Sequence, residues 1–254
     1  NENETSYSHK SIGGYHPAKL RRYQELIEAY ISPEMQRAGS AVVQAQGDMT
    51  KVSGDSIYPV LNMLNTKYFI LPLQGGQTVP VMNPYAYGNA WFVGSIKYVN
   101  NANEELSGVG QVNLRHVAVA DVKFREVLGE AVPQDDMAIV KLAKYEPNEL
   151  TYDISSSKGG VVVFSEIYYP GWTATVDGQP AEVGRVDYVL RALNVKPGKH
   201  KVVLTFKPKS IRETETVAYI AFALLVVAII AGIWFEERKK RKAATTDNEK
   251  ASID

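Results

Sequence analysis

The most constraining feature of this sequence is a run at residues 217–235, VAYIAFALLVVAIIAGIWF, that contains no charged residue. As an α-helix the run would be about 28 Å long, close to the hydrocarbon thickness of a bilayer. Tyr219 and Trp234 lie near its two ends, and consecutive basic residues follow at 238–242. Aromatic rings favour both membrane interfaces, and basic flanks stay on the cytoplasmic side. A buried helix of a large soluble core is the alternative, and the basic flank argues against it.

We therefore predict a protein of the cytoplasmic (inner) membrane, with residues 1 to about 215 outside the cytoplasm and the C-terminal tail inside. The absence of cysteine suits a bacterial extracytoplasmic domain. Because residue 1 is Asn and no hydrophobic signal-peptide core follows it, we expect one of two origins. Either a signal peptide has been removed, or the chain is the C-terminal part of a longer polytopic protein.

The composition limits the function classes. The chain has 28 basic and 28 acidic residues, so its formal net charge is zero, and no basic face for nucleic acid is indicated. The cysteine count is zero, which excludes disulfides and thiolate chemistry. A length of about 215 residues before the apolar run suffices for one large or two small domains.

The N-terminal part has the pattern of an α+β fold. We expect a turn and then a helix across residues 12–31, with a second helix beginning at Ser32-Pro33-Glu34 because serine caps and proline favours a first turn. Further helices are predicted at 55–65 and 101–108, whereas residues 109–134 have the pattern of either short strands or a helix at 122–128. Strands are predicted at 67–71 and 90–99, with a loop over 74–88 that is rich in Gly, Pro and Asn.

The pattern changes near residue 137, where short strand-like runs are separated by turn signals such as Pro170-Gly171 and Asp177-Gly178. The runs lie at 138–147, 149–155, 160–169, 171–177, 181–184, 188–195 and 200–208. Short strands at this spacing predict a β-sandwich of the jelly-roll or immunoglobulin-like kind. The predicted domains are α+β residues 1–135, the sandwich at 136–208, a connector with the membrane helix at 209–235, and a basic tail at 236–254.

Signatures of soluble enzymes are absent from the sequence, including GxSxG, HExxH, GxxxxGK and GxGxxG. The four histidines are too scattered for a recognisable metal-ligand spacing. We therefore predict neither a metal nor a cofactor, and we assign no catalytic residue.

Basic residues and tyrosines gather in the stretch HKSIGGYHPAKLRRY at 9–23, around a Gly-Gly turn before a predicted helix. A helix N-terminus with nearby cations can hold a phosphate or a sugar-phosphate. The alternative is a solvated basic helix face or contact with lipid headgroups. The candidate phosphate-binding residues are His9, Lys10, His16, Lys19 and Arg22.

A second stretch, YYPGW at 168–172, places aromatic rings at the edge of the predicted sandwich. Exposed rings can stack a sugar, and nearby Arg185, Asp187 or Arg191 could bind its hydroxyls. The alternative, which we favour, is that the rings pack the sandwich edge. The candidate residues for glycan contact or edge packing are Tyr168, Tyr169, Trp172 and Arg191.

The segment at 164–208 resembles the C-terminal extracytoplasmic module of the YfhO family of bacterial membrane proteins. The matching elements are the YYPGW run, the VDG turn, the Asp187-Tyr188 pair with Arg191, and PGKH before the last strand. Residues 5–24 and 61–70 are similar to long members of that family of the Bacteroides type. The resemblance extends over residues 5–235.

This resemblance implies a polytopic protein similar to GT-C-type glycosyltransferases, which transfer a sugar from a polyprenyl-phosphate carrier to an acceptor outside the cytoplasm. The acidic catalytic motif of such enzymes lies in an early loop, so we expect it outside this chain, and this part alone to be inactive. The implied partners are the lipid bilayer, the remaining transmembrane helices of the full-length chain and the lipid-linked sugar. The alternative is a non-enzymatic, membrane-anchored glycan-binding or scaffold module.

Overall fold

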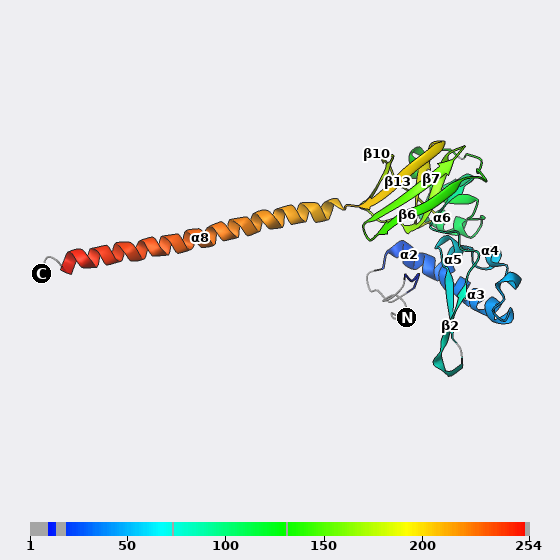
Figure 1. The fold of residues 1–254 in the computed structure, drawn as a ribbon, viewed down its shortest axis with the longest axis horizontal. Coiled ribbons are helices and arrows are strands. Elements are labelled where there is room, and N and C mark those ends of the chain that lie inside the picture. The colour runs from blue at the N-terminus through cyan, green and yellow to red at the C-terminus, as the bar shows by residue number, and fades with distance from the viewer. Residues whose placement is uncertain (1–9, 14–18, 73, 131, 252–254) are drawn as a thin grey trace. The chain divides into compact units, whose positions relative to one another are not determined.

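A computed structural model of the 254-residue chain describes residues 10–13, 19–72, 74–130 and 132–251 (Figure 1). The chain divides into two compact units, Asn1–Phe206 and Lys207–Asp254. The predicted fold class is confirmed, because the chain mixes helices with several antiparallel sheets and has one helix capable of spanning a membrane. The boundary predicted between residues 135 and 136 stays a prediction.

Two antiparallel sheets form a sandwich in the first unit. The five-stranded sheet has the order β10 (Gln179–Ala181), β9 (Trp172–Val176), β13 (Gly198–Phe206), β7 (Glu149–Ser156) and β6 (Ile139–Glu146). The four-stranded sheet has the order β11 (Gly184–Val186), β12 (Leu190–Val195), β8 (Gly160–Ile167) and β3 (Ala90–Val93). The run predicted at 181–184 is not a single strand, because Ala181 ends β10, Gly184 begins β11, and residues 182–183 connect the two.

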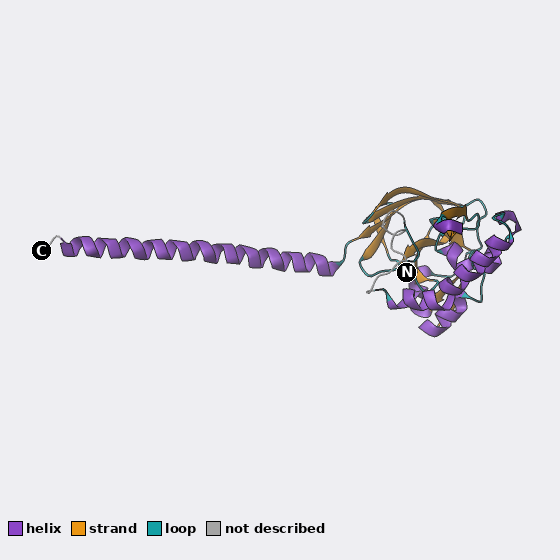
Figure 2. Ribbon diagram, turned by 90° about the horizontal axis from the view of Figure 1, so that it is seen from below, coloured by secondary structure: helices purple, strands orange, loops and turns teal. Residues whose placement is uncertain are grey.

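The four-stranded sheet is buried on both faces. In β8, Val162 and Phe164 pack in the core shared with the five-stranded sheet, whereas Val161 and Val163 pack in the core shared with the helices. Figure 2 shows the helices of this unit gathered on one side of its strands. Because successive residues of a strand point to opposite faces, a strand buried on both faces is apolar throughout. This explains the uninterrupted apolar run in β8.

One long helical stretch forms the N-terminal part of this unit, as α2 (Arg21–Leu26), the π-helical turn η1 (Ile27–Ile31) and α3 (Ser32–Gln44). The α-helix α3 begins at Ser32 as predicted, but Ser32 does not cap it, because Ser32 itself has helical angles of φ −64° and ψ −47° and the stretch continues from η1 without a break. A proline inside a helix lacks an N–H group and crowds the preceding turn. The wider π turn directly before Pro33 accommodates that crowding.

The single helix predicted over 55–65 is wrong, because it divides into α4 (Gly54–Ile57) and α5 (Pro59–Met63). Tyr58 has φ −145° and ψ 54°, outside the helical region that the following Pro59 disfavours. The predicted strand β1 (Tyr68–Pro72) is confirmed, but the loop predicted over 74–88 contains β2 (Thr78–Met82), which pairs with β1 as a hairpin. A two-stranded ribbon tolerates the proline in β2 because both strands have a free edge.

The strand predicted over 90–99 divides at Gly94 into β3 and β4 (Ser95–Val99), which belong to different sheets. Gly94 donates its N–H to the His116 carbonyl at 2.8 Å, which carries the chain away from β8. β4 then pairs in parallel with β5 (Val117–Asp121) through the crossover helix α6 (Ala102–Val109). The other short helices are η2 (Met49–Lys51), η3 (Gln74–Gly76), η4 (Val122–Phe124) and α7 (Arg125–Leu128). The last two confirm the helix predicted at 122–128.

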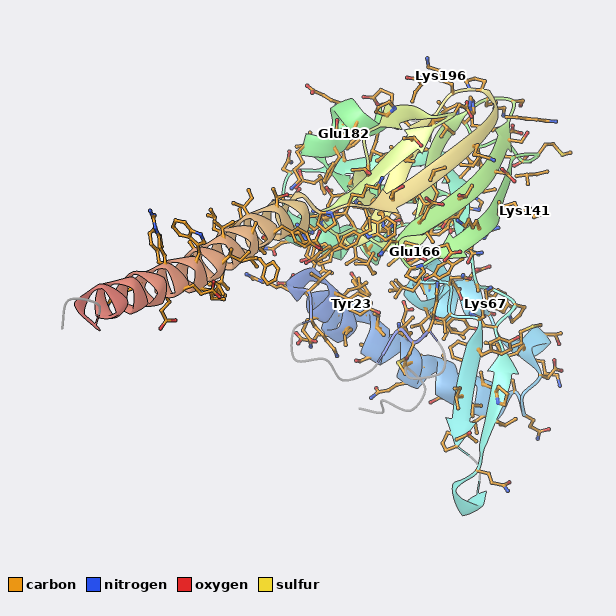
Figure 3. All side chains as sticks on the ribbon, turned by 60° about the vertical axis from the view of Figure 1, so that its left-hand side comes forward. Tyr23, Lys67, Lys141, Glu166, Glu182 and Lys196 are labelled. Carbon is orange, nitrogen blue, oxygen red and sulfur yellow. The ribbon has the colours of Figure 1, made fainter. Side chains whose placement is uncertain are left out.

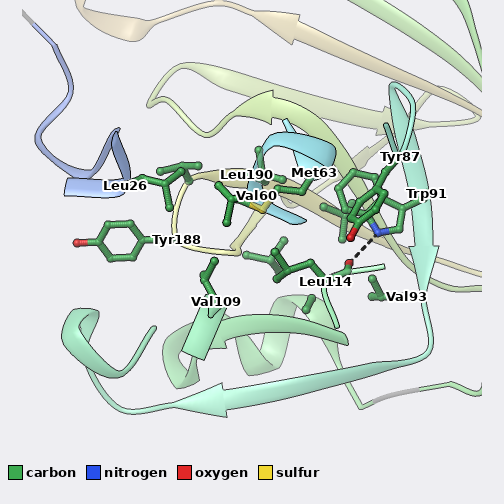
Figure 4. Close-up of a cluster of buried hydrophobic side chains, with 14 of the residues drawn as sticks. Leu26, Val60, Met63, Tyr87, Trp91, Val93, Val109, Leu114, Tyr188 and Leu190 are labelled. Atoms are coloured by element: carbon green, nitrogen blue, oxygen red, sulfur yellow. Dashed lines mark hydrogen bonds between the residues drawn. The ribbon is translucent and has the colours of Figure 1, made fainter. Parts of the chain in front are cut away.

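The core between the helices and the four-stranded sheet includes Leu26, Met63, Val109 and Leu190 (Figure 4). The indole N–H of Trp91 donates to the Leu114 carbonyl at 3.2 Å, so the buried ring leaves no unpaired donor.

The second unit is dominated by α8 (Lys209–Ala251). Its segment Thr214–Lys239 is long enough to cross a bilayer, contains an 18-residue window with a mean hydropathy of 2.6, and includes the predicted run at 217–235. Its apolar side chains are exposed, for example Phe222 at 65% and Leu224 at 66%. A water-soluble protein buries such side chains, so the composition and exposure agree with a membrane span.

Candidate functional site

The structure separates the basic residues that the sequence grouped as a phosphate site. His9 and His16 lie outside the described residues. Lys10 and Arg22 are described, and they contact different carboxylates: Glu166 and Glu105 respectively. Lys19 is half-buried, and among the described residues it makes no ion pair within 4.0 Å.

Arg22 belongs to a buried charge network, which we name the Glu105 cluster: Arg22, Glu25, Glu105, Arg185 and Tyr188. Helix α2 supplies Arg22 and Glu25, α6 supplies Glu105, and β11 supplies Arg185. The fully buried Oε2 of Glu105 accepts a hydrogen bond from Nη1 of Arg22 and another from Nη2 of Arg185, both at 2.9 Å. Two cations thus share one carboxylate, which joins three elements of the fold.

Tyr188 completes this cluster from the turn between β11 and β12. Its hydroxyl donates to the Glu25 carboxylate, and that hydrogen bond holds the pKa of Glu25 below its usual value. The Arg22 guanidinium lies 4.4 Å from the centre of the Tyr188 ring. Burial raises the pKa of Tyr188 to about 12, so the phenol stays protonated and remains a donor. The turn is thereby fixed to α2.

The same turn has an unusual backbone. Asp187 and Tyr188 have φ values of 48° and 71°, in the left-handed region that non-glycine residues rarely occupy. Asp187 donates its N–H to the Val119 carbonyl at 2.7 Å, and its Oδ1 accepts from the Val119 N–H at 2.8 Å. Complete burial raises the pKa of Asp187 to about 8, and its Oδ2 has no hydrogen-bond partner among the described residues. The docked carboxyl holds the strained turn in place.

A second network surrounds Arg191 in β12, and we name it the Arg191 cluster: Lys10, Tyr145, Glu166, Trp172 and Arg191. The guanidinium lies 3.9 Å from the Trp172 ring centre and 3.6 Å from Glu166, and its Nε donates to the Ile167 carbonyl at 3.0 Å. The Lys10 ammonium lies 3.6 Å from the same carboxylate and 3.4 Å from the Tyr145 ring centre. Lys10, which was predicted to bind phosphate, therefore lies in one cluster with Trp172 and Arg191, which were predicted for glycan contact or edge packing.

The aromatic residues predicted for glycan contact differ in exposure. Tyr168 is partly buried and packs edge-on against Phe124, with ring centres 6.0 Å apart. Trp172 is also partly buried, between Arg191 and Phe206. Tyr169 is 45% exposed and lies 6.0 Å from the Phe206 ring centre. Only Tyr169 of this group presents a large ring area to solvent, so glycan contact and edge packing both stay predictions.

Sequence reasoning missed the role of Glu105, although a signal was present. In α6, positions 102, 105, 106 and 109 lie on one helix face, and the other three carry Ala102, Leu106 and Val109. A glutamate among apolar residues at helical spacing marks a buried charge that needs a cationic partner. The partners themselves lie 83 and 80 positions away in the sequence, which local patterns do not pair.

Neither cluster coincides with a deep cavity. A depression of about 370 Å³ lies along α3, and another of about 270 Å³ is lined by Asp55, residues 84–87 and Arg115. Within the described part of the chain, no group of three His, Cys, Asp or Glu side chains could hold a metal ion. The chemistry open to these clusters is binding of an anion or a sugar through cations, carboxylates and aromatic faces.

Residues 103–218 match a family model described as "Bacterial membrane protein YfhO". The matched segment contains Glu105, Arg185, Tyr188 and Arg191, and it ends within the candidate membrane span. No curated protein matched the chain. The resemblance drawn from the sequence is confirmed over the matched residues.

Proposed function

Because residues 103–218 form a YfhO-family region of a bacterial membrane protein, we propose that this chain is the extracytoplasmic C-terminal part of a polytopic, GT-C-like glycosyltransferase. The full protein transfers a sugar from a polyprenyl-phosphate carrier to an acceptor in the cell envelope. The catalytic motif lies outside this chain, and the folded unit described here binds the lipid-linked donor or guides the acceptor glycan.

The observation that supports donor binding is the partly exposed guanidinium of Arg22 in the Glu105 cluster. Arg22 and Arg185 share Glu105, while the Glu25 carboxylate is taken up by Tyr188 and Arg21. The Arg22 side chain remains 30% exposed, so its outer N–H groups can bind a phosphate oxygen while its inner group keeps Glu105. A polyprenyl-phosphate donor is an anion held at a membrane, and this unit continues into a helix that can enter one.

The phosphate role is tested in the full-length protein by replacing exposed cations. Lys10→Gln and Lys19→Gln remove charge without disturbing Glu105, and Arg22→Lys keeps the charge but removes the planar fork. We expect each to weaken binding of the lipid-linked sugar. The matched control is Lys141→Gln, because Lys141 is an exposed cation on β6 that belongs to neither cluster and makes no ion pair within 4.0 Å among the described residues. Unchanged transfer rates and donor affinity in all three variants would refute the phosphate role.

The proposed sidedness is supported by the basic residues 238–242 directly after the span. Since the chain has no cysteine, a single cysteine can report sidedness without background labelling. In intact cells, a membrane-impermeant maleimide should label Glu130→Cys, in the first unit, and spare Glu237→Cys, which follows the apolar run at 217–235. The reverse pattern would overturn the extracytoplasmic assignment.

A second candidate function is a non-enzymatic, membrane-anchored module that binds envelope glycans. It is favoured by Tyr169, whose ring is 45% exposed beside Phe206 and can stack on a sugar. The full reading frame discriminates the two candidates. Many upstream hydrophobic spans with an acidic loop motif would support the transferase, whereas a lone signal peptide would support the binding module.

A further inference from the structure

The β1–β2 hairpin presents an apolar face that nothing in the folded unit covers. Figures 1 and 3 show it projecting beyond the rest of the unit, with Lys67 near its base. In the antiparallel register Tyr68 lies opposite Met82, and Ile70 lies opposite Pro80. Tyr68, Ile70 and Met82 are 57%, 48% and 61% exposed. Since alternate residues share one face of a strand, these side chains form a single apolar surface.

The opposite face of the hairpin is anchored to the core. Phe69 is partly buried and packs edge-on against Tyr58, with ring centres 5.2 Å apart. The alternating pattern of exposed and partly buried residues runs along both strands. Phe69 therefore anchors the hairpin to the core through the face opposite Tyr68 and Ile70.

The sequence of this region carries no charge. Between Lys67 and Lys97 there is no Asp, Glu, Lys or Arg, in a chain of which 22% is charged. A protruding strand in water is ordinarily protected by charged side chains against pairing with other chains. An exposed apolar patch without such protection marks an interaction site. Its lack of charge favours a partner that is itself apolar, because a charged protein surface would lose hydration there without compensation.

We propose that the exposed face of the β1–β2 hairpin inserts into the headgroup region of the bilayer that anchors the same chain. Phe206 ends the folded unit and Thr214 begins the candidate span, so the seven residues 207–213 join them over at most about 28 Å. A compact unit of this length has a radius of gyration of about 17 Å. A tether no longer than the unit itself keeps every face of the unit close to lipid, at a high effective concentration.

The depth of insertion follows from the backbone. A two-stranded ribbon has unpaired N–H and C=O groups along both outer edges, and the hydrocarbon core offers them no partner. The headgroup region supplies water and polar partners for the edges while it accepts Ile70 and Met82 between lipid chains. Tyr68, with an apolar ring and a polar hydroxyl, matches the residue type enriched at that level. The proposal rests on the span and not on sugar transfer.

The absence of cysteine permits a direct test with the full chain reconstituted in vesicles of phosphatidylethanolamine and phosphatidylglycerol. Single-cysteine variants Ile70→Cys and Met82→Cys carry an environment-sensitive fluorophore. The control is Val43→Cys, because Val43 is an apolar residue on α3 that is 68% exposed. We expect blue-shifted emission and quenching by headgroup-level nitroxide lipids at positions 70 and 82, and neither effect at position 43.

The variant Tyr68→Ser, placed in the Ile70→Cys background, supplies a second measurement. Loss of one large apolar contact should lower the ratio of inserted to free hairpin about tenfold, and it leaves the anchoring Phe69 face intact. Emission at positions 70 and 82 equal to that at 43 would overturn the proposal. The proposal would also be overturned if nitroxides placed at the bilayer centre quenched the fluorophores at positions 70 and 82 more strongly than nitroxides at headgroup level. A blue shift that grows with protein concentration would show that the face contacts a second protein copy, and it would overturn the proposal that the partner is lipid.

Discussion

Replacing Glu105 by glutamine tests whether the Glu105 cluster stabilises the folded unit. Glu105 is fully buried, and its Oε2 accepts hydrogen bonds at 2.9 Å from both Arg22 and Arg185. Glutamine keeps the size of the side chain but removes its charge. The Arg185 side chain is 8% exposed, so it is left as a buried cation without a carboxylate.

Breaking a buried ion pair by removing one partner costs about 3–5 kcal/mol, because the remaining charge is desolvated and uncompensated. For a unit of about 200 residues each kcal/mol lowers the melting temperature by about 2–4 °C. We therefore expect Glu105→Gln to lower the melting temperature by about 6–20 °C. Thermal unfolding of the full chain in detergent micelles, followed by near-ultraviolet circular dichroism of the buried Trp91, measures the loss.

Two variants separate this explanation from a general sensitivity to substitution. Glu130→Gln removes a carboxylate that is 79% exposed and 3.9 Å from Arg125, and it should change stability by less than about 0.5 kcal/mol. Combining Glu105→Gln with Arg185→Met removes the stranded cation and should restore most of the loss. The reasoning is refuted if Glu105→Gln has the melting temperature of the wild type, or if the double variant is no more stable than Glu105→Gln alone.

Three further outcomes depend on single residues. Burial raises the pKa of Asp187 from 3.8 to about 8, so the stabilisation by its protonated carboxyl is complete below about pH 4 and is lost as the pH rises through 8. Denaturant unfolding between pH 5 and 9 measures this decline in the free energy of unfolding, and Asp187→Asn should flatten it. Gly159→Ala places a Cβ 2.6 Å from a backbone oxygen at φ 68°, and it should lower the free energy of unfolding by about 2 kcal/mol or more. Gly178 has φ 81° but open space around it, so Gly178→Ala should lower that free energy by about 1 kcal/mol. Equal losses of melting temperature in the two variants would contradict the clash at Gly159. Arg191→Lys gives up the planar contact 3.9 Å from the Trp172 ring and should lower the denaturation midpoint by the equivalent of about 1–2 kcal/mol.

Much of the fold could be predicted because its strands and span carry strong local periodicity. In β13, Val202 and Leu204 alternate with more exposed residues, and both are fully buried as the alternation indicates. The incorrect predictions lie where contacts between residues distant in the sequence override the local pattern. Ser32-Pro33 has the pattern of a helix start, yet a π turn lets one helix continue through it. The strand break at Gly94 depends on a hydrogen bond to His116, which lies 22 positions further along the chain.

The candidate site was predictable only in part, for the same reason. Charge density singled out Arg22 and Lys10, and aromatic clustering singled out Trp172. The carboxylates that pair with them, Glu105 and Glu166, lie 83 and 156 positions away from Arg22 and Lys10 and have no local signal of pairing. Composition therefore identifies groups that need partners, while the topology of the sheets decides which partners they obtain.

The elements that carry the family resemblance meet around one turn, and this limits how the proposed function can be tested. Tyr168 donates its N–H to the Val189 carbonyl at 2.6 Å, and Tyr188 donates to a carboxylate on α2. The aromatic edge of the sandwich is thus connected to the helix that presents Arg22. A substitution at Tyr188 would move both candidate binding surfaces together, so loss of activity there could not distinguish sugar contact from displacement of α2. Tyr169 is exposed and takes no part in the contacts that join the aromatic edge to α2. If Tyr169→Ala leaves the stability unchanged, a change in glycan binding by this variant therefore indicates direct contact between Tyr169 and the sugar.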